Sequence, residues 1–179
     1  MAALEAESSP SDPQQSPDLN STLRTWSGRQ GHRGVRILVV DDDSGIRWLV
    51  LRILEAAGYR VMMASEGAAA LRAAELAMMD SRCAIHLVLT DLDMPVLDGF
   101  ELGRRLTAWR PPVPVIYMSG TTYGLSHLAR LSPGAHVIEK PFSAHTLLRE
   151  VSLVLPMAAA ALRSPAPWPA AATTLPKHP

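Results

Sequence analysis

Arg36-Ile37-Leu38-Val39-Val40-Asp41-Asp42-Asp43 is the stretch of this 179-residue chain that decides its fold. A short apolar run without polar alternation is typical of a strand that is buried on both faces of a parallel sheet. The run stops abruptly at three acidic residues, so the predicted strand leads into a cluster of carboxylates. A helix is predicted directly afterwards, over 44–57, because apolar residues recur there at helical spacing and Gly58 follows as a stop signal.

The same unit, an apolar strand followed by a helix, recurs along the chain. Further strands are predicted at 59–64, 86–90, 114–118 and 136–139. Further helices are predicted at 67–79, 99–109, 125–131 and after Ser143, a good N-cap. Five strands that alternate with five helices over about 120 residues predict an α/β fold, a doubly wound five-stranded parallel sheet with helices on both faces.

The composition changes on both sides of this alternating region. Residues 1–34 are rich in Ser, Pro, Gln, Asp and Gly without any period, so we expect a disordered N-terminal segment. Residues 35–155 are expected to form one folded domain. Residues 156–179 are rich in Pro and Ala, and we expect a mobile or polyproline-like tail there.

The net charge, the cysteine count and the lack of long apolar segments argue against several classes of protein. The chain has 17 basic and 17 acidic residues, and a formal net charge of zero argues against nucleic-acid binding as its main function. The single cysteine, Cys83, excludes an intramolecular disulfide and is expected to be buried or half-buried. No signal peptide or membrane-spanning segment is visible, so a soluble cytoplasmic protein is expected.

Polar residues stand at the carboxyl ends of four of the predicted strands, where ligands of an open parallel sheet bind. These ends carry the pair Asp41-Asp42, then Asp91, Ser119 and Lys140. Three clustered carboxylates repel one another and need a cation, for which Mg²⁺, a hard ion that takes oxygen ligands, is suited. One carboxylate can then attack a phosphoryl group, while the lysine and the hydroxyl contact the phosphoryl oxygens.

Each of these residues taken alone is more often a solvated turn, a loop hydroxyl or a surface charge. Their shared position at strand ends is what favours an acyl-phosphate site.

Four segments of the chain also resemble the motifs of response-regulator receiver domains of two-component signalling. They are Leu38 to Asp43, Leu87 to Pro95 followed by Asp98-Gly99, Val115 to Gly120, and Glu139 to Phe142. The resemblance covers roughly 35–155. The Met-Ser-Gly run and the Lys-Pro-Phe-Ser ending are most similar to receivers attached to hybrid sensor kinases. No kinase motif is visible, so the resemblance implies a stand-alone receiver or a relay partner.

The resemblance implies a flavodoxin-like fold with strand order 2-1-3-4-5, and it assigns roles to individual residues. Asp91 would be the phosphoacceptor, with Ser119 as the switch hydroxyl and Lys140 as the phosphate-contacting lysine. The Lys140–Pro141 bond is expected to be cis, which places the lysine head in the pocket. The implied Mg²⁺ ligands are Asp42, Asp91, the backbone carbonyl of Asp93 and, through water, Asp41; Asp43 is left outside the metal shell.

The implied function is phosphorelay signalling. A phosphohistidine on a sensor histidine kinase or a histidine phosphotransfer protein would donate its phosphoryl group to Asp91. The protein would be a switch that assists its own phosphorylation and dephosphorylation, not an enzyme acting on another substrate. A downstream protein would read the surface formed by the fourth and fifth predicted helices and the fifth strand; neither nucleic acid nor a membrane is an expected partner.

Two positions depart from the usual receiver pattern. Val137 stands three positions before the lysine, where many receivers have an aromatic residue whose ring turns inward on activation, so switching is expected to work differently here. Asp93, two residues after the acceptor, has a side chain that can reach the attacking water and alter the lifetime of the phosphate.

Two rival interpretations stay open at this point. Asp91-Leu92-Asp93 also resembles the nucleophile motif of haloacid-dehalogenase-type phosphatases, although that motif normally ends the first strand and is followed by a longer chain. The other rival is a degenerate receiver, an interaction module that never takes phosphate.

Overall fold

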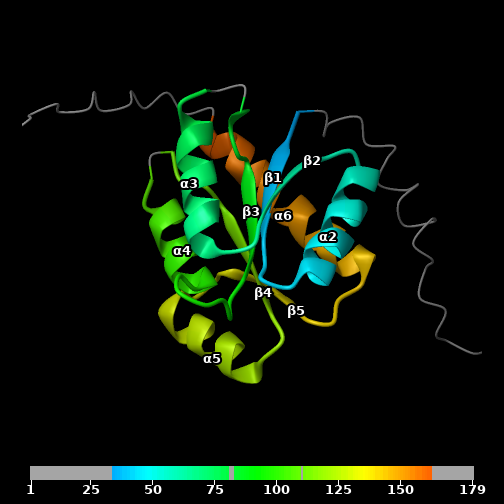
Figure 1. Cartoon of the computed structure of the whole chain (residues 1–179), viewed down its shortest axis with the longest axis vertical. Helices are drawn as coiled ribbons and strands as arrows, with labels where there is room; N and C mark the ends of the chain where they lie inside the picture. The colour runs from blue at the N-terminus through cyan, green and yellow to red at the C-terminus, as the bar shows by residue number, and fades with distance from the viewer. Residues whose placement is uncertain (1–33, 81–82, 110, 163–179) are drawn as a thin grey trace, which may run out of the picture.

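Five parallel strands form a single sheet in the computed structural model, which describes residues 34–80, 83–109 and 111–162. The strands follow one another in the sheet in the order β2-β1-β3-β4-β5, which confirms the predicted flavodoxin-like topology (Figure 1). They are β1 (Arg36–Val40), β2 (Arg60–Ala64), β3 (Leu87–Asp91), β4 (Val115–Ser119) and β5 (His136–Glu139). Each paired strand is parallel to its neighbour.

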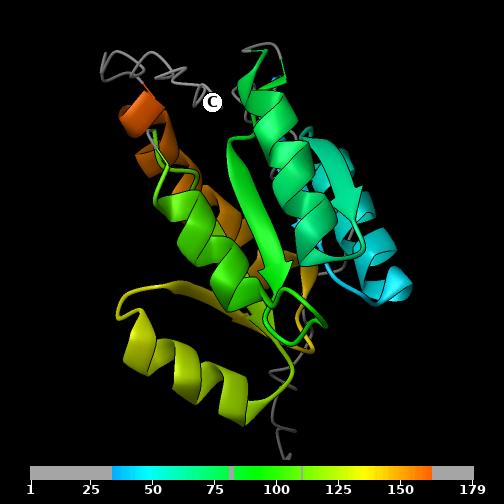
Figure 2. The ribbon, with the colours of Figure 1, turned by 60° about the vertical axis from the view of Figure 1, so that its left-hand side comes forward.

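Five helices in the described part of the chain cover the two faces of this sheet. They are α2 (Ser44–Ala56), α3 (Gly67–Met78), α4 (Gly99–Thr107), α5 (Thr122–Leu131) and α6 (Ala144–Leu162). Helices α2 and α6 lie on one face, and α3 and α4 lie on the other (Figures 1 and 2). Helix α5 runs below α4 in Figure 2, at an angle to it.

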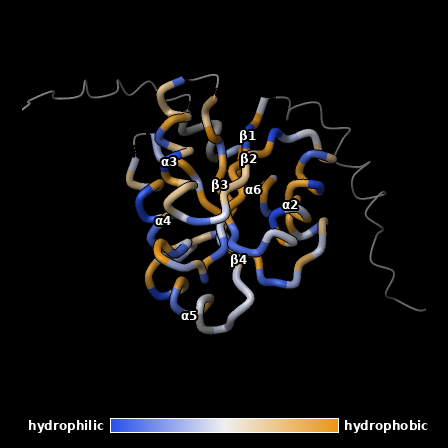
Figure 3. Tube along the Cα trace, viewed as in Figure 1, coloured by the Kyte–Doolittle hydropathy of each residue, from blue (hydrophilic) through white to orange (hydrophobic). Residues whose placement is uncertain are grey.

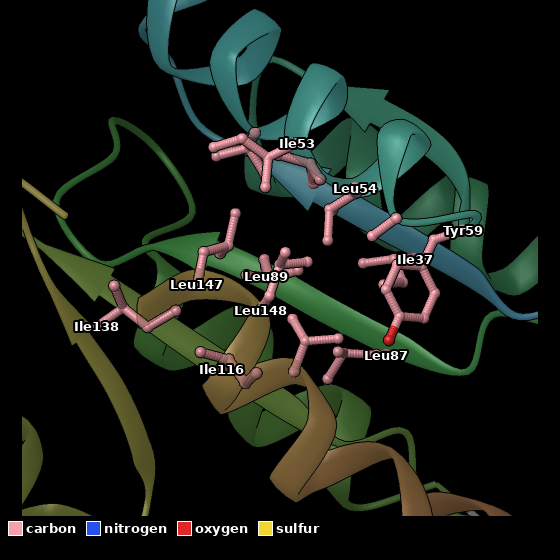
Figure 4. Close-up of a cluster of buried hydrophobic side chains, with 14 of the residues drawn as sticks. Ile37, Ile53, Leu54, Tyr59, Leu87, Leu89, Ile116, Ile138, Leu147 and Leu148 are labelled. Carbon is pink, nitrogen blue, oxygen red and sulfur yellow. The ribbon is translucent and has the colours of Figure 1, made fainter. Parts of the chain in front are cut away.

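Two hydrophobic clusters, one on each face, hold the layers together. Alternate residues of one strand point to opposite faces, so Ile37 and Val39 join the cluster under α2 and α6 while Leu38 and Val40 join the other. In Figure 4, Leu87 and Leu89 of the central strand β3 lie among side chains of the first cluster. Figure 3 shows the apolar colour concentrated along the central strands. Burial of each such side chain contributes about 1.5–3 kcal/mol.

The last helix is longer than the sequence suggested. Helix α6 continues through Pro156 to Leu162, whereas a tail was expected from 156 onward. Val154 and Leu155 are still buried and hold the turn that contains the proline, and the alanines that follow are strong helix formers. These contributions offset the roughly 3 kcal/mol that proline costs inside a helix.

Cys83 is exposed, so the expectation of a buried or half-buried thiol is wrong. It lies between α3 and β3, and residues that connect elements are commonly exposed. The expectations of a disordered N-terminal segment and a Pro/Ala-rich tail fall, for residues 1–33 and 163–179, outside the described residues. Of the helices that the structure describes, none has the length and apolar character needed to cross a membrane.

Candidate functional site

The carboxyl ends of β1, β3, β4 and β5 meet at one edge of the sheet, as the topology requires. Val40 lies beside Thr90 in the register of β1 and β3, so Asp41 and Asp91 follow on adjacent strands. The ladder continues past the strand ends, because the Lys140 backbone N–H donates to the Ser119 carbonyl oxygen at 2.8 Å. Asp41, Asp91, Ser119 and Lys140 therefore lie at the same edge, where the sequence placed them.

Lys140 joins the two buried carboxylates of this edge. Its Nζ lies 2.7 Å from Asp41 Oδ2 and 2.8 Å from Asp91 Oδ1. Asp41 is fully buried, Asp91 is 6% exposed, and the Lys140 side chain keeps 18% of its exposure. Charges this deeply buried persist only when they are paired, so the three groups depend on one another. The peptide bond between Lys140 and Pro141 is cis.

The electrostatics of the edge reflect competing effects of burial and charge. Burial raises the pKa of Asp91 above its ordinary value, although the hydrogen bond and charge of Lys140 act in the opposite direction. The charges of Asp41 and Asp93 push the Asp91 pKa further up. Burial acts to lower the pKa of Lys140, but its bonds to Asp41 and Asp91 outweigh burial and leave that pKa raised. The lysine is therefore a permanent cation in the site.

The carboxylates fit a divalent cation. Asp41, Asp42 and Asp91 each offer one oxygen, and these atoms lie within 4.8 Å of one another. Asp42 is exposed, so the cluster opens to solvent on one side. An all-oxygen donor set with an open side suits Mg²⁺, which keeps several waters when it is bound by one or two carboxylates.

Two neighbours of the acidic cluster have structural roles. Asp43 is the N-cap of α2, and its Oδ1 accepts hydrogen bonds from the backbone N–H groups of Gly45 and Ile46. Arg47, one turn into α2, donates from Nη1 to the backbone carbonyl oxygen of Asp41 at 2.5 Å. Sequence reasoning did not find Arg47, because no local pattern reveals which backbone atom an arginine reaches.

Ser119 is fully buried, and its hydroxyl is held by its own loop. Ser119 Oγ donates to the Thr121 carbonyl oxygen and accepts from the Thr121 N–H, both at 3.2 Å. Asp93, whose side chain is exposed, accepts a hydrogen bond at Oδ2 from Thr121 Oγ1 at 3.0 Å. Sequence reasoning also missed Thr121; its signal was a threonine directly before a helix, a common N-cap.

Val137 is half-buried, and its neighbour across the strand pair is Tyr117 of β4. Both side chains belong to the cluster under α3 and α4. Tyr117 is only 5% exposed, and burial raises the pKa of its hydroxyl. The aromatic ring in this region is therefore that of Tyr117 on β4, the strand next to β5, and position 137 itself carries valine.

A family model described as the response regulator receiver domain matches residues 37–152. The chain is 32% identical over 121 residues to the response regulator receiver protein CpdR of Brucella abortus (strain 2308). This match covers 67% of this chain and 96% of CpdR. It is 35% identical over 122 residues to the response regulator MprA of Mycolicibacterium vanbaalenii, covering 68% of this chain but only 50% of MprA. This chain therefore spans nearly all of the first relative and about half of the second.

Solved structures give the same picture. The receiver domain from the hybrid histidine kinase CckA is 31% identical to this chain, with a TM-score of 0.53. The match covers 67% of this chain and 98% of that domain.

Proposed function

The chain belongs to the response regulator receiver domain family of two-component signalling, and from that premise we propose that Asp91 accepts a phosphoryl group from a phosphohistidine in a Mg²⁺-dependent reaction. The observation that carries the proposal is the buried Asp41–Lys140–Asp91 arrangement, with exposed Asp42 beside it. It combines a nucleophilic carboxylate, a fixed cation and a set of oxygen ligands at one sheet edge.

The residues at this edge can perform the transfer. A carboxylate oxygen of Asp91 attacks the phosphorus in line with the P–N bond of the phosphohistidine. A new P–O bond forms as the P–N bond breaks, and the electron pair of the broken bond returns to the imidazole. Lys140 Nζ, already 2.8 Å from Asp91 Oδ1, is within reach of the incoming phosphoryl oxygens.

A Mg²⁺ ion held by Asp42, Asp91 and the backbone carbonyl of Asp93, with Asp41 contributing through water, would supply positive charge that offsets the phosphoryl oxygens. Asp41 suits the outer position, because its Oδ2 accepts from Lys140 and its Oδ1 accepts from the Asp43 N–H at 2.9 Å. Asp41 and Asp91 also hold the pKa of Lys140 up and so keep its ammonium group charged.

Phosphorylation would switch the protein by recruiting Ser119. The phosphoryl group draws the Ser119 hydroxyl away from its own loop and shifts an equilibrium between inactive and active states. The surface formed by α5, β5 and α6, which corresponds to the fourth and fifth helices and the fifth strand of the sequence prediction, then changes and is read by a protein partner. Hydrolysis of the acyl phosphate resets the switch.

The donor in this proposal is a sensor histidine kinase or a histidine phosphotransfer protein. The likeness to the receiver domain of a hybrid histidine kinase supports a place in a relay of this kind. Phosphotransfer profiling against purified histidine kinases of the source organism identifies the donor.

Incubation with Mg²⁺ and acetyl phosphate tests the chemistry directly. We expect a base-labile phosphoryl adduct by intact mass spectrometry in the wild-type chain and in Asp93→Asn, and none in Asp91→Asn or in the presence of EDTA. A chain without any adduct is a degenerate receiver. Steady turnover of phosphomonoesters would instead identify a phosphatase of the haloacid-dehalogenase type.

A further inference from the structure

Thr121 connects the switch serine and the start of α5, which are its neighbours in the sequence, to Asp93, which lies 28 positions away. Its Oγ1 donates to Asp93 Oδ2 in the loop after β3, at 3.0 Å. The same Oγ1 accepts from the backbone N–H of Gly124 at 3.1 Å and so caps the N-terminus of α5. Its backbone N–H and carbonyl bind the Ser119 hydroxyl. The loop that carries Asp93, the switch serine and the start of α5 therefore all meet at one residue.

The protons of the two hydroxyls are fully committed in this arrangement. Thr121 has a single hydroxyl proton, and it is directed at Asp93. Ser119 also has a single hydroxyl proton; the Thr121 carbonyl accepts it at 3.2 Å, and Thr121 Oγ1 at 3.5 Å is the other acceptor within reach. Ser119 can donate to a phosphoryl oxygen only by leaving that carbonyl, and the Thr121 N–H then loses its acceptor. A movement of Ser119 toward Asp91 must therefore disturb the backbone at Thr121.

The three oxygens are packed closely around Gly124. A side-chain carbon at position 124 would lie 2.9 Å from Ser119 Oγ, 3.0 Å from Thr121 Oγ1 and 3.4 Å from Asp93 Oδ2. Gly124 is buried, and no larger residue fits there without displacing Ser119 or Thr121. The absence of a side chain at Gly124 therefore leaves the space that Ser119, Thr121 and Asp93 need to meet.

Helix α5 has few other attachments among the described residues. Of its described side chains, Leu128 is the one large apolar residue that is fully buried, and Leu131 at the end of the helix is half exposed. The ring of His127 meets Phe100 of α4 edge-on, with centroids 6.0 Å apart. The first turn of α5, in contrast, is tied to the phosphorylation edge through Thr121 and Asp93. The Thr121–Asp93 hydrogen bond can therefore fix the position of the N-terminus of α5.

We propose that Asp93 and Thr121 form a latch that holds α5 and Ser119 in the unphosphorylated arrangement; this inference rests on the proposed phosphorylation of Asp91. In the latched state Asp93 fixes Thr121, and Thr121 keeps the Ser119 hydroxyl in its own loop. Phosphorylation gives Ser119 a competing acceptor, and its departure opens the latch. Asp93 and Thr121 are positioning residues, since they act through Ser119.

Comparison of Asp93→Ala with Asp93→Asn separates the effect of the Thr121–Asp93 hydrogen bond from that of the Asp93 charge. Both variants remove the negative charge beside Asp91, but the asparagine side chain keeps an oxygen that accepts from Thr121 Oγ1. The bond is solvent-exposed, so its loss is expected to shift the latched equilibrium roughly threefold. Thr121→Ser, which keeps the hydroxyl, is the conservative control, and Thr121→Val removes it.

Hydrogen exchange of the backbone amides at the start of α5, in the full chain without phosphodonor, is the first measurement. We expect Asp93→Ala to exchange roughly threefold faster there than Asp93→Asn, while Thr121→Ser exchanges like the wild type. Saturation with beryllium fluoride and MgCl₂, which mimics the phosphoryl group, should remove the difference between the pair. In a titration, Asp93→Ala should respond at a roughly threefold lower beryllium fluoride concentration than Asp93→Asn.

Non-additivity gives a further check, because Asp93→Ala and Asp93→Asn should no longer differ in exchange or titration once Thr121→Val has removed the donating hydroxyl. Equal exchange in Asp93→Ala and Asp93→Asn, in a chain that responds to beryllium fluoride, overturns the latch alone. A difference between the pair that persists at saturation also overturns it. Asp91→Asn is the negative control and should not respond to beryllium fluoride. If the wild-type chain does not respond either, both the proposed function and the latch are overturned.

Discussion

Replacement of Lys140 by methionine should destabilise the metal-free protein substantially. The Lys140 ammonium contacts Asp41 at 2.7 Å and Asp91 at 2.8 Å, and both carboxylates are almost fully buried. Removal of one partner of a buried ion pair costs about 3–5 kcal/mol. Because the Lys140 side chain keeps 18% of its exposure and the edge opens to solvent at Asp42, we expect about 2–3 kcal/mol.

Urea unfolding in EDTA, followed by circular dichroism, measures this loss. Asp91→Asn combined with Lys140→Met should recover part of it, because one of the two facing charges is gone. Addition of Mg²⁺ should stabilise Lys140→Met more than the wild type, since the ion replaces the missing positive charge. Arg72→Met is the control: its exposed pair with Glu66, at 3.4 Å, contributes at most about 1 kcal/mol.

The reasoning is refuted if Lys140→Met unfolds at the same urea concentration as the wild type in EDTA. It is also refuted if Asp91→Asn gives no recovery in the lysine variant, because the loss would then have a source other than the facing carboxylates.

Three further predictions concern residues outside the charged edge. Gly103→Ala should destabilise the protein by about 1–3 kcal/mol in urea unfolding, because the added carbon would overlap the Tyr117 hydroxyl; Tyr117→Phe in the same chain should recover part of the loss. Burial lowers the pKa of His86, whose Nδ1 accepts the Arg36 N–H, so the native state favours the neutral ring. The unfolded chain then binds more protons, and stability should fall as pH drops below 6.5 toward the folded pKa, with a flatter profile in His86→Gln. Val96 is 99% exposed at φ 69°, so Val96→Asn should raise the thermal midpoint by relieving about 1 kcal/mol of strain.

The positive φ and the full exposure of Val96 are features that the sequence pattern did not reveal. The Leu97 N–H donates to the Pro95 carbonyl at 2.8 Å, which closes a tight turn around a residue type that rarely adopts positive φ. Neither the turn nor its strain is visible in the motif, because valine gives no turn signal.

The architecture was determined by the sequence itself. Strand and helix periods are local properties, so the alternation beginning at Arg36 predicted the parallel sheet and its two helical layers, and the strand order came from the motif resemblance. The same patterns indicated which edge of the sheet carries the polar residues. Element ends were less predictable: α5 begins at Thr122, earlier than expected, because Thr121 caps it, and α6 passes Pro156 because its buried residues still pack.

Contacts between distant residues were decided only by the tertiary structure. Lys140 meets Asp41 across 99 positions of the chain and Asp91 across 49. The sequence placed these groups at one edge but did not show which carboxylates share the ammonium, since strand register and side-chain burial decide that. The bond between Thr121 and Asp93, 28 positions apart, had no sequence signal at all. Both contacts exist because parallel strands bring their carboxyl ends, and the loops that follow them, together in space.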